Sequence, residues 1–210
     1  MARLRAYKPC SVQKGLRKEG GATRRATLLV MVVVFLFSCG KGSQHAATGP
    51  KDGRGVDMAI DLTSAAFGKG GAIASRYTCD GPGSSPPLSW GSVPNGTQSV
   101  ALTVHDPDAP GGTFVHWVIY DLPSDTRRLP EDVPNRRTLP SGAEQGLNGA
   151  GTIGYKGPCP PSGTHRYIFE IYALDTKLDL GGGATAQRLS DAMDGHVLAE
   201  GRLMGTYRRR

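Results

Sequence analysis

The sequence lacks the short motifs that mark two large classes of hydrolase. Its 210 residues contain no HExxH pair of zinc ligands and no GxSxG turn around a nucleophilic serine. No segment of the chain is repeated. The apolar run at residues 26–37 is too short to cross a bilayer, which takes about 20 residues. These absences disfavour a zincin-type protease, a serine hydrolase with a nucleophile elbow and a membrane-spanning helix.

Net charge is also absent from most of the chain. The formal charge of +7 at pH 7 is carried by residues 1–38, which hold eight basic residues and one acidic residue. The remaining 17 basic residues are matched by 17 acidic residues. The composition therefore gives no support for a nucleic-acid-binding face, and only the tail at residues 208–210 is locally basic.

Residues 1–38 have the pattern of an export signal. Arg24 and Arg25 precede the apolar run, which suits the hydrophobic core of a signal peptide. The run ends in Leu-Phe-Ser-Cys, which resembles a bacterial lipoprotein signal with cleavage before Cys39 and lipid on its sulfur. Ser38 is the small residue expected there, whereas Phe37 departs from the pattern. We expect an exported lipoprotein, periplasmic or at the cell surface, that reaches the membrane through lipid on Cys39. A plain secretory signal and an uncleaved anchor are the alternatives.

The four cysteines agree with export. Cys10 would leave with the signal and Cys39 would carry lipid, so Cys79 and Cys159 remain as a pair in an oxidising compartment. A disulfide between them would close a loop of about 80 residues and contribute roughly 3 to 4.5 kcal/mol in the chain-entropy model. Two separate buried thiols are the alternative.

The rest of the chain predicts one mostly-β domain. Residues 39–55 are rich in glycine and polar side chains and predict a flexible tether, and residues 56–207 have the length of a single domain. Strand-like runs bounded by Gly, Pro, Asn and Asp predict strands over residues 58–64, 87–90, 99–106, 113–122, 164–174 and 201–207. Apolar residues at helical spacing predict one helix over residues 184–200, with Thr185 as its N-cap. The segment 123–153 is poor in apolar residues and predicts an irregular loop.

Two segments hold most of the functional information. They are HDPDAPGGTFVHW (105–117) and GYKGPCPPSGTHRY (154–167), and in each a rigid Pro/Gly loop delivers a histidine into a strand. If the two loops meet, Asp106, Asp108, His116 and His165 surround one small polar pocket. Such a pocket suits an anion, a zwitterion or a metal ion.

These segments, with SPPLSW before them and GHVLAEGRLMGTY after them, resemble the phosphatidylethanolamine-binding protein family, and most closely its bacterial Raf-kinase-inhibitor-like branch. The resemblance covers roughly residues 57–207. It implies a β-sandwich with a small anion-binding pocket, no enzymatic activity and no cofactor. The ligand that it implies is a phosphate-like anion or a phospholipid headgroup. The ligand-binding residues that it implies are Asp106, Asp108, Pro110, His116, Gly157, Pro158, His165 and Tyr167.

The residue chemistry agrees with an anion pocket. His116 and His165 can each present an N–H group and become cationic beside a phosphate. We assign Asp106 to the ligand side, where it orients a histidine or receives an ammonium group, and Asp108 to loop structure. Binding should weaken above about pH 7, where an unperturbed histidine is mostly neutral.

Two other functions stay open at this point. Two histidines and one aspartate could hold Zn²⁺ with an open position for water, as in a metal-dependent hydrolase, although no close-spaced ligand pair is present. The domain could also be a protein-interaction module, such as a protease or kinase inhibitor. A homodimer and a monomer are both compatible with the sequence.

Overall fold

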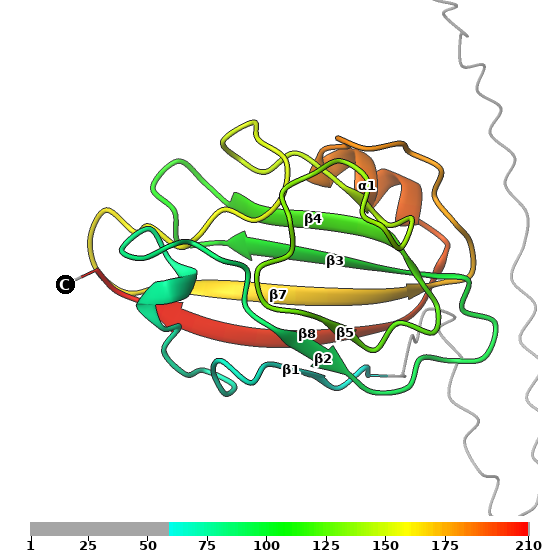
Figure 1. Ribbon diagram of the computed structural model, residues 1–210, viewed down its shortest axis with the longest axis horizontal. Helices are drawn as coiled ribbons and strands as arrows, with labels where there is room; N and C mark the ends of the chain where they lie inside the picture. Colours follow the sequence, from blue (N-terminus) through cyan, green and yellow to red (C-terminus); the bar gives the residue numbers. More distant parts are fainter. Residues whose placement is uncertain (1–58, 210) are drawn as a thin grey trace, which may run out of the picture. The chain divides into compact units, whose positions relative to one another are not determined.

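The structure is a computed structural model that describes residues 59–209. The expected signal peptide, the lipidation site Cys39 and the tether lie outside the described residues. Figure 1 shows long strands lying side by side, with one helix beside β4. The elements are β1 (Leu62–Thr63), the 3₁₀ turn η1 (Ser75–Tyr77), β2 (Leu88–Trp90), β3 (Ser99–Asp106), β4 (Phe114–Pro123), β5 (Arg128–Leu129), β6 (Glu144–Gln145), β7 (His165–Leu174), α1 (Ala186–Met193) and β8 (Val197–Tyr207). The mostly-β prediction is confirmed.

The strands form two antiparallel sheets. The larger sheet has the order β6-β4-β3-β7-β8, and the smaller has the order β1-β2-β5. Alternate residues of the large sheet enter different cores. Val100, Leu102 and Val104 of β3 pack with Leu88 and the rest of the small sheet in the main core, as expected for side chains on one face of a strand.

The opposite face of the large sheet is covered by α1. Ala101 of β3 and Tyr120 of β4 pack there against Leu189 and Met193 of the helix. Thr185 is the N-cap, as predicted, because its hydroxyl accepts a hydrogen bond from the amide of Arg188 at 3.2 Å. None of the helices among the described residues is long and apolar enough to cross a membrane.

The structure corrects two element predictions. The helix ends at Met193 instead of residue 200, because Gly195 takes a φ of 79° that helical residues do not adopt. Val197, which fits the helical spacing, instead begins β8 and pairs with Leu174. The segment 123–153 is also not wholly irregular, since it contains the two-residue strands β5 and β6.

Candidate functional site

Three strands of the large sheet bring the predicted site residues to one end of the domain. Asp106 is the last residue of β3, His116 is the third residue of β4, and His165 is the first residue of β7. Because β3 is antiparallel to both neighbours, the end of β3 lies beside the beginnings of β4 and β7. The two Pro/Gly loops of the sequence therefore meet, which is the condition that a shared pocket requires.

A β-bulge directs His116 toward this end of the core. Val104 pairs with Trp117 and His105 pairs with Val115, so His116 has no partner residue on β3. The extra residue changes the alternation of side chains along β4. Its backbone carbonyl accepts a hydrogen bond from the amide of Lys156 at 2.8 Å, and its Nδ1 donates to the Lys156 carbonyl at 2.5 Å. The second Pro/Gly loop (residues 154–164) thus holds both the backbone and the ring of His116.

Asp106 holds the other histidine. His165 Nδ1 lies 2.7 Å from Asp106 Oδ2, and Asp106 Oδ1 accepts the amide of Asp108 at 2.8 Å. The Asp106 and His165 residues are only 4% and 7% exposed. Each carboxylate oxygen therefore has a protein donor, and Asp106 orients His165 from the floor of the site.

A cavity of about 390 Å³ opens at this junction, which is within the size range of small-molecule sites. Its polar groups come mainly from Asp106, His116 and His165 on the strands and from Lys156 and Gly157 on the second loop. Most of the remaining wall is apolar and is formed by Ala109, Pro110, Phe114, Ala150, Cys159, Pro160 and Pro161. The ring of Phe114 also packs edge-on against His116, with centroids 4.8 Å apart. The site is a small apolar cup with two imidazole rings at its base.

The hydrogen bonds fix which ring nitrogen of each histidine is free. A carbonyl and an ionised carboxylate can only accept, so Nδ1 carries the proton in both His116 and His165. Among residues 59–209 neither Nε2 atom has a hydrogen-bond partner, and neither is a fully buried unsatisfied atom. Each Nε2 is therefore available to a ligand, as an acceptor when the ring is neutral and as a donor when it is protonated.

Burial lowers the pKa of His116 below its usual value of 6.5. The Lys156 carbonyl and the charge of Asp106 act against this shift, and the nearby charge of Lys156 adds to it. The lowered pKa therefore favours a neutral His116 at neutral pH. This modifies the expectation of an ordinary histidine that titrates near pH 7.

Five of the predicted ligand-binding residues line the cavity, namely Asp106, Pro110, His116, Gly157 and His165. Asp108 instead forms a two-pronged ion pair with Arg166, with distances of 2.6 and 2.9 Å. These hydrogen bonds lower the pKa of Asp108 to about 2. Asp108 thus fastens the first loop to β7, in agreement with the role that we assign to it.

Tyr167 and Pro158 lie behind the cavity wall. Tyr167 packs edge-on against His116, with centroids 5.1 Å apart, and its buried hydroxyl has no hydrogen-bond partner among the described residues. Burial, followed by the charge of Asp106, raises its pKa. The carbonyl of Pro158 accepts the amide of Cys79 at 3.0 Å. Tyr167 therefore supports His116, and Pro158 joins the second loop to the segment at Cys79.

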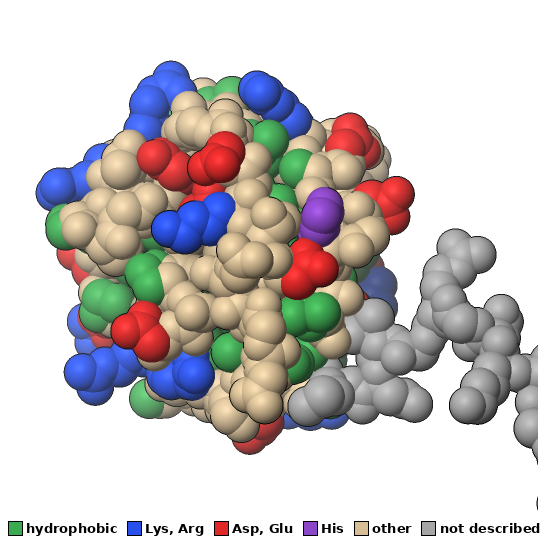
Figure 2. Space-filling view, turned by 90° about the vertical axis from the view of Figure 1, so that its right-hand side faces the viewer, with side chains coloured by type: hydrophobic (Ala, Val, Ile, Leu, Met, Phe, Trp, Pro, Cys, Tyr) green, Lys and Arg blue, Asp and Glu red, His purple; other side chains and the backbone are tan. Residues whose placement is uncertain are grey.

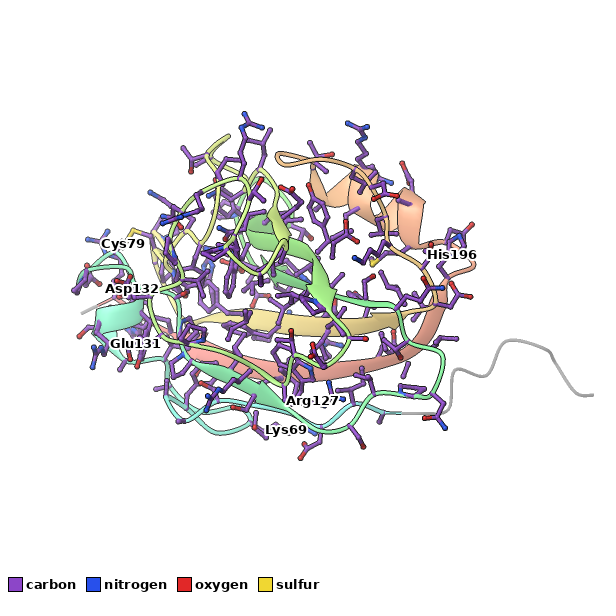
Figure 3. The ribbon with its side chains drawn as sticks, turned by 45° about the vertical axis from the view of Figure 1, so that its right-hand side comes forward. Lys69, Cys79, Arg127, Glu131, Asp132 and His196 are labelled. Atoms are coloured by element: carbon purple, nitrogen blue, oxygen red, sulfur yellow. A yellow bond between two sulfur atoms is a disulfide. The ribbon has the colours of Figure 1, made fainter. Side chains whose placement is uncertain are left out.

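The structure contains the predicted disulfide. Cys79 and Cys159 are bonded, with their Cα atoms 5.4 Å apart. Gly157 lies against the same segment so closely that a Cβ atom would be 3.0 Å from Thr78 Cα. Figure 3 shows Cys79 at one end of the domain and His196 at the other. Cys159 also lines the cavity, so the disulfide joins the cavity wall to the segment at Cys79.

Sequence reasoning misses several residues of the site. Lys156 and Phe114 both line the cavity; Lys156 precedes the predicted Gly157, and Phe114 stands two positions before the predicted His116. Ala150 comes from a segment that carries no motif, and nothing in the sequence marks it. The other histidines of the described chain lie elsewhere: His105 is 3.7 Å from Glu170, and His196 is 2.8 Å from Asp175. Within residues 59–209 no group of three His, Cys, Asp or Glu side chains is placed to hold a metal ion.

Comparison with known proteins identifies the family. Residues 63–208 match the family model described as phosphatidylethanolamine-binding protein. The chain belongs to the phosphatidylethanolamine-binding protein family. Membership makes it a small-ligand-binding or interaction protein.

The chain is similar to UPF0098 proteins of two microorganisms. It is 54% identical over 150 residues to a UPF0098 protein of Methanothermobacter thermautotrophicus, covering 71% of this chain and 99% of the relative. It is 46% identical over 153 residues to a UPF0098 protein of Aquifex aeolicus, covering 71% and 89%.

Two solved structures have the same fold. A putative phosphatidylethanolamine-binding protein homologue, CT736 from Chlamydia trachomatis, is 44% identical, with a TM-score of 0.67 over 72% of this chain and 99% of that one. YbcL of E. coli, described as a new member of the mammalian family, is 33% identical, with a TM-score of 0.67 over 73% of this chain and 100% of that one. Both matches cover nearly the whole of the described domain.

Proposed function

We propose that this protein is an exported binding protein for small phosphate-like anions, including phosphate esters and phospholipid headgroups, and that it is not an enzyme. The observation that carries the proposal is the pair of buried histidines at the base of one small cavity. Both rings are held through Nδ1, which leaves both Nε2 atoms for the ligand. Groups held in place before the ligand arrives lose little freedom on binding, which favours affinity.

Phosphate chemistry suits two such nitrogens. A protonated imidazole donates a charge-assisted hydrogen bond to a phosphate oxygen, and a neutral imidazole accepts one from a protonated phosphate. Gly157 lets the second loop pack closely at the cavity wall. The apolar walls then surround the organic part of an ester.

The proposed location rests on the cysteines and the amino-terminal pattern. The Cys79–Cys159 disulfide favours an oxidising compartment, and residues 1–38 have the pattern of a lipoprotein signal. We therefore propose a lipid anchor on Cys39. Mass spectrometry of the protein from its native membrane fraction should find a mature chain that begins at a lipidated Cys39.

The test of the binding function removes the two rings. Purified His116→Ala and His165→Ala variants should each bind inorganic phosphate and phosphoethanolamine at least about tenfold more weakly, because each loses a charge-assisted hydrogen bond of roughly 1.5 to 3 kcal/mol. Isothermal titration calorimetry measures the affinities, and thermal unfolding confirms that the variants fold. His196→Ala, at the other end of the domain, is the matched control. Unchanged affinity in the double variant would refute the site.

A further inference from the structure

The charges around the cavity are distributed unevenly between its floor and its mouth. Asp106 lies at the floor, where it is 4% exposed, together with the two histidines. Lys156 lines the same cavity but is exposed to solvent. Because the free Nε2 atoms are at the floor, an anion bound there directs its organic substituent toward the mouth.

Within residues 59–209 the lining of the cavity offers no free carboxylate to receive a positive charge. Among the described residues that line the cavity, Asp106 is the only acid, and both of its oxygens already accept hydrogen bonds from His165 and Asp108. Asp108 is held in its ion pair with Arg166. The acids of the first loop are therefore committed to positioning the site.

Lys156 is a cation without a partner at this position. Within residues 59–209 its ammonium forms no ion pair, whereas Arg166 is neutralised by Asp108. It is close enough to His116 to be one of the charges that lower the pKa of that ring, after the larger effect of burial. The backbone of Lys156 makes two hydrogen bonds with His116, one to its carbonyl and one from its ring, and these fix the position from which the lysine side chain extends.

We propose that Lys156 makes the cavity selective for phosphate monoesters with a neutral or anionic substituent, and that it disfavours the zwitterionic phosphoethanolamine group. This rests on the proposed anion-binding function. The ammonium of phosphoethanolamine would extend toward the mouth and meet the Lys156 ammonium, with no carboxylate to compensate it. A second negative charge on the ligand would instead be attracted.

A matched pair of ligands tests the selectivity. Propyl phosphate has the shape of phosphoethanolamine with a methyl group in place of the ammonium. We expect the oxidised full chain to bind propyl phosphate about fivefold more tightly than phosphoethanolamine. The reason is that the ammonium groups of Lys156 and phosphoethanolamine repel each other in a partly hydrated setting. Raising the salt concentration should reduce this ratio, because the charges at the mouth are screened.

Substitutions isolate the contribution of Lys156. The apolar walls favour the propyl group in every variant, so a change in the ratio of affinities reports the charge alone. We expect Lys156→Gln to bring the ratio toward unity and Lys156→Glu to lower it further. Lys177→Gln is the control, since Lys177 is exposed at the end that carries His196 and Asp175. Thermal unfolding checks that each variant folds.

The outcomes separate the two proposals. If no phosphate ester binds the unmodified protein, the binding function is wrong and the selectivity falls with it. If both esters bind but their ratio is the same in all Lys156 variants, or if the unmodified protein prefers phosphoethanolamine, only the selectivity is wrong. Binding to phosphatidylcholine vesicles that contain phosphatidic acid would identify a lipid as the source of the monoester, and binding of propyl phosphate alone would identify a soluble ester.

Discussion

At the scale of single residues, the site depends on which nitrogen of each histidine is already bound. The Lys156 carbonyl and the Asp106 carboxylate hold Nδ1 of His116 and His165, so anion binding takes place at Nε2. Burial lowers the pKa of His116 and so favours its neutral form. A phosphate that receives a hydrogen bond from Nε2 of this ring must therefore bring a proton with it or cause one to be taken up from solvent.

This predicts that anion binding is coupled to proton uptake. An anion stabilises the charged ring, so the pKa of His116 is higher in the complex than in the lowered free state. Between those two pKa values the complex holds more protons, and affinity falls as pH rises through that window. Calorimetry of propyl phosphate binding near pH 7, in two buffers of different ionisation enthalpy, measures the uptake. Zero uptake and a pH-independent affinity would contradict the assignment of His116 as a donor to the anion.

The two histidines of the site were predictable from the sequence, whereas the residues that hold them were not. His116 and His165 each follow a Pro/Gly loop, and that local pattern singles them out. The role of Asp106 depends on His165, which lies 59 residues further along the chain, and the role of Lys156 depends on a bulge in β4. Contacts between distant segments and the chemical roles that follow from them arise only when the chain folds.

At the scale of elements, the second loop is built in two differently anchored halves. Residues 154–158 are joined to neighbouring segments by hydrogen bonds that Tyr155 and Lys156 donate and that the Pro158 carbonyl accepts. Residues 159–164 make no backbone hydrogen bond to the rest of residues 59–209 outside the sheet ladder. The disulfide at Cys159 is thus the main anchor of the cavity wall formed by Pro160 and Pro161.

Reduction of the disulfide should therefore loosen this wall before it affects the sheet. We expect amide hydrogen exchange at Cys79, whose amide donates to the Pro158 carbonyl beside the disulfide, to accelerate roughly tenfold or more on reduction with dithiothreitol, while exchange in β7 is unchanged. The Cys79→Ser/Cys159→Ser double variant should show the same exchange without reductant. Unchanged exchange in protein whose two thiols are shown by mass spectrometry to be free would contradict this account.

Long strands were predictable, and short or interrupted elements were not. β3, β4 and β7 are runs of 8 to 10 residues rich in β-branched and aromatic side chains, which is enough to set their type. β5 and β6 contain two residues each, so no periodicity can reveal them. The helix was extended too far because Val197 fits both a helical face and a strand, and pairing with Leu174 decides in favour of the strand.

At the scale of the whole molecule, the strand-like runs in the sequence predict strands but not how the sheets stack. That the domain is a sandwich came from the resemblance to a family, and the two cores on either face of the large sheet now explain it.

The absence of net charge beyond residue 38 is different, because composition alone determines it. Figure 2 shows acidic and basic side chains interspersed on the end of the domain opposite the cavity.

The charge balance predicts weak binding to polyanions. A chain that begins at Cys39 has equal numbers of acidic and basic residues, so it should elute from heparin below roughly 0.15 M salt at pH 7.5, because few counterions are released on contact. A chain that retains residues 1–38 should elute later, since that segment carries the whole charge of +7. The basic residues of the domain are also partly neutralised, as Arg166 is by Asp108 and Arg209 by Asp80. Retention of the shorter chain well above this salt concentration would reveal a basic face and reopen nucleic acid as a partner.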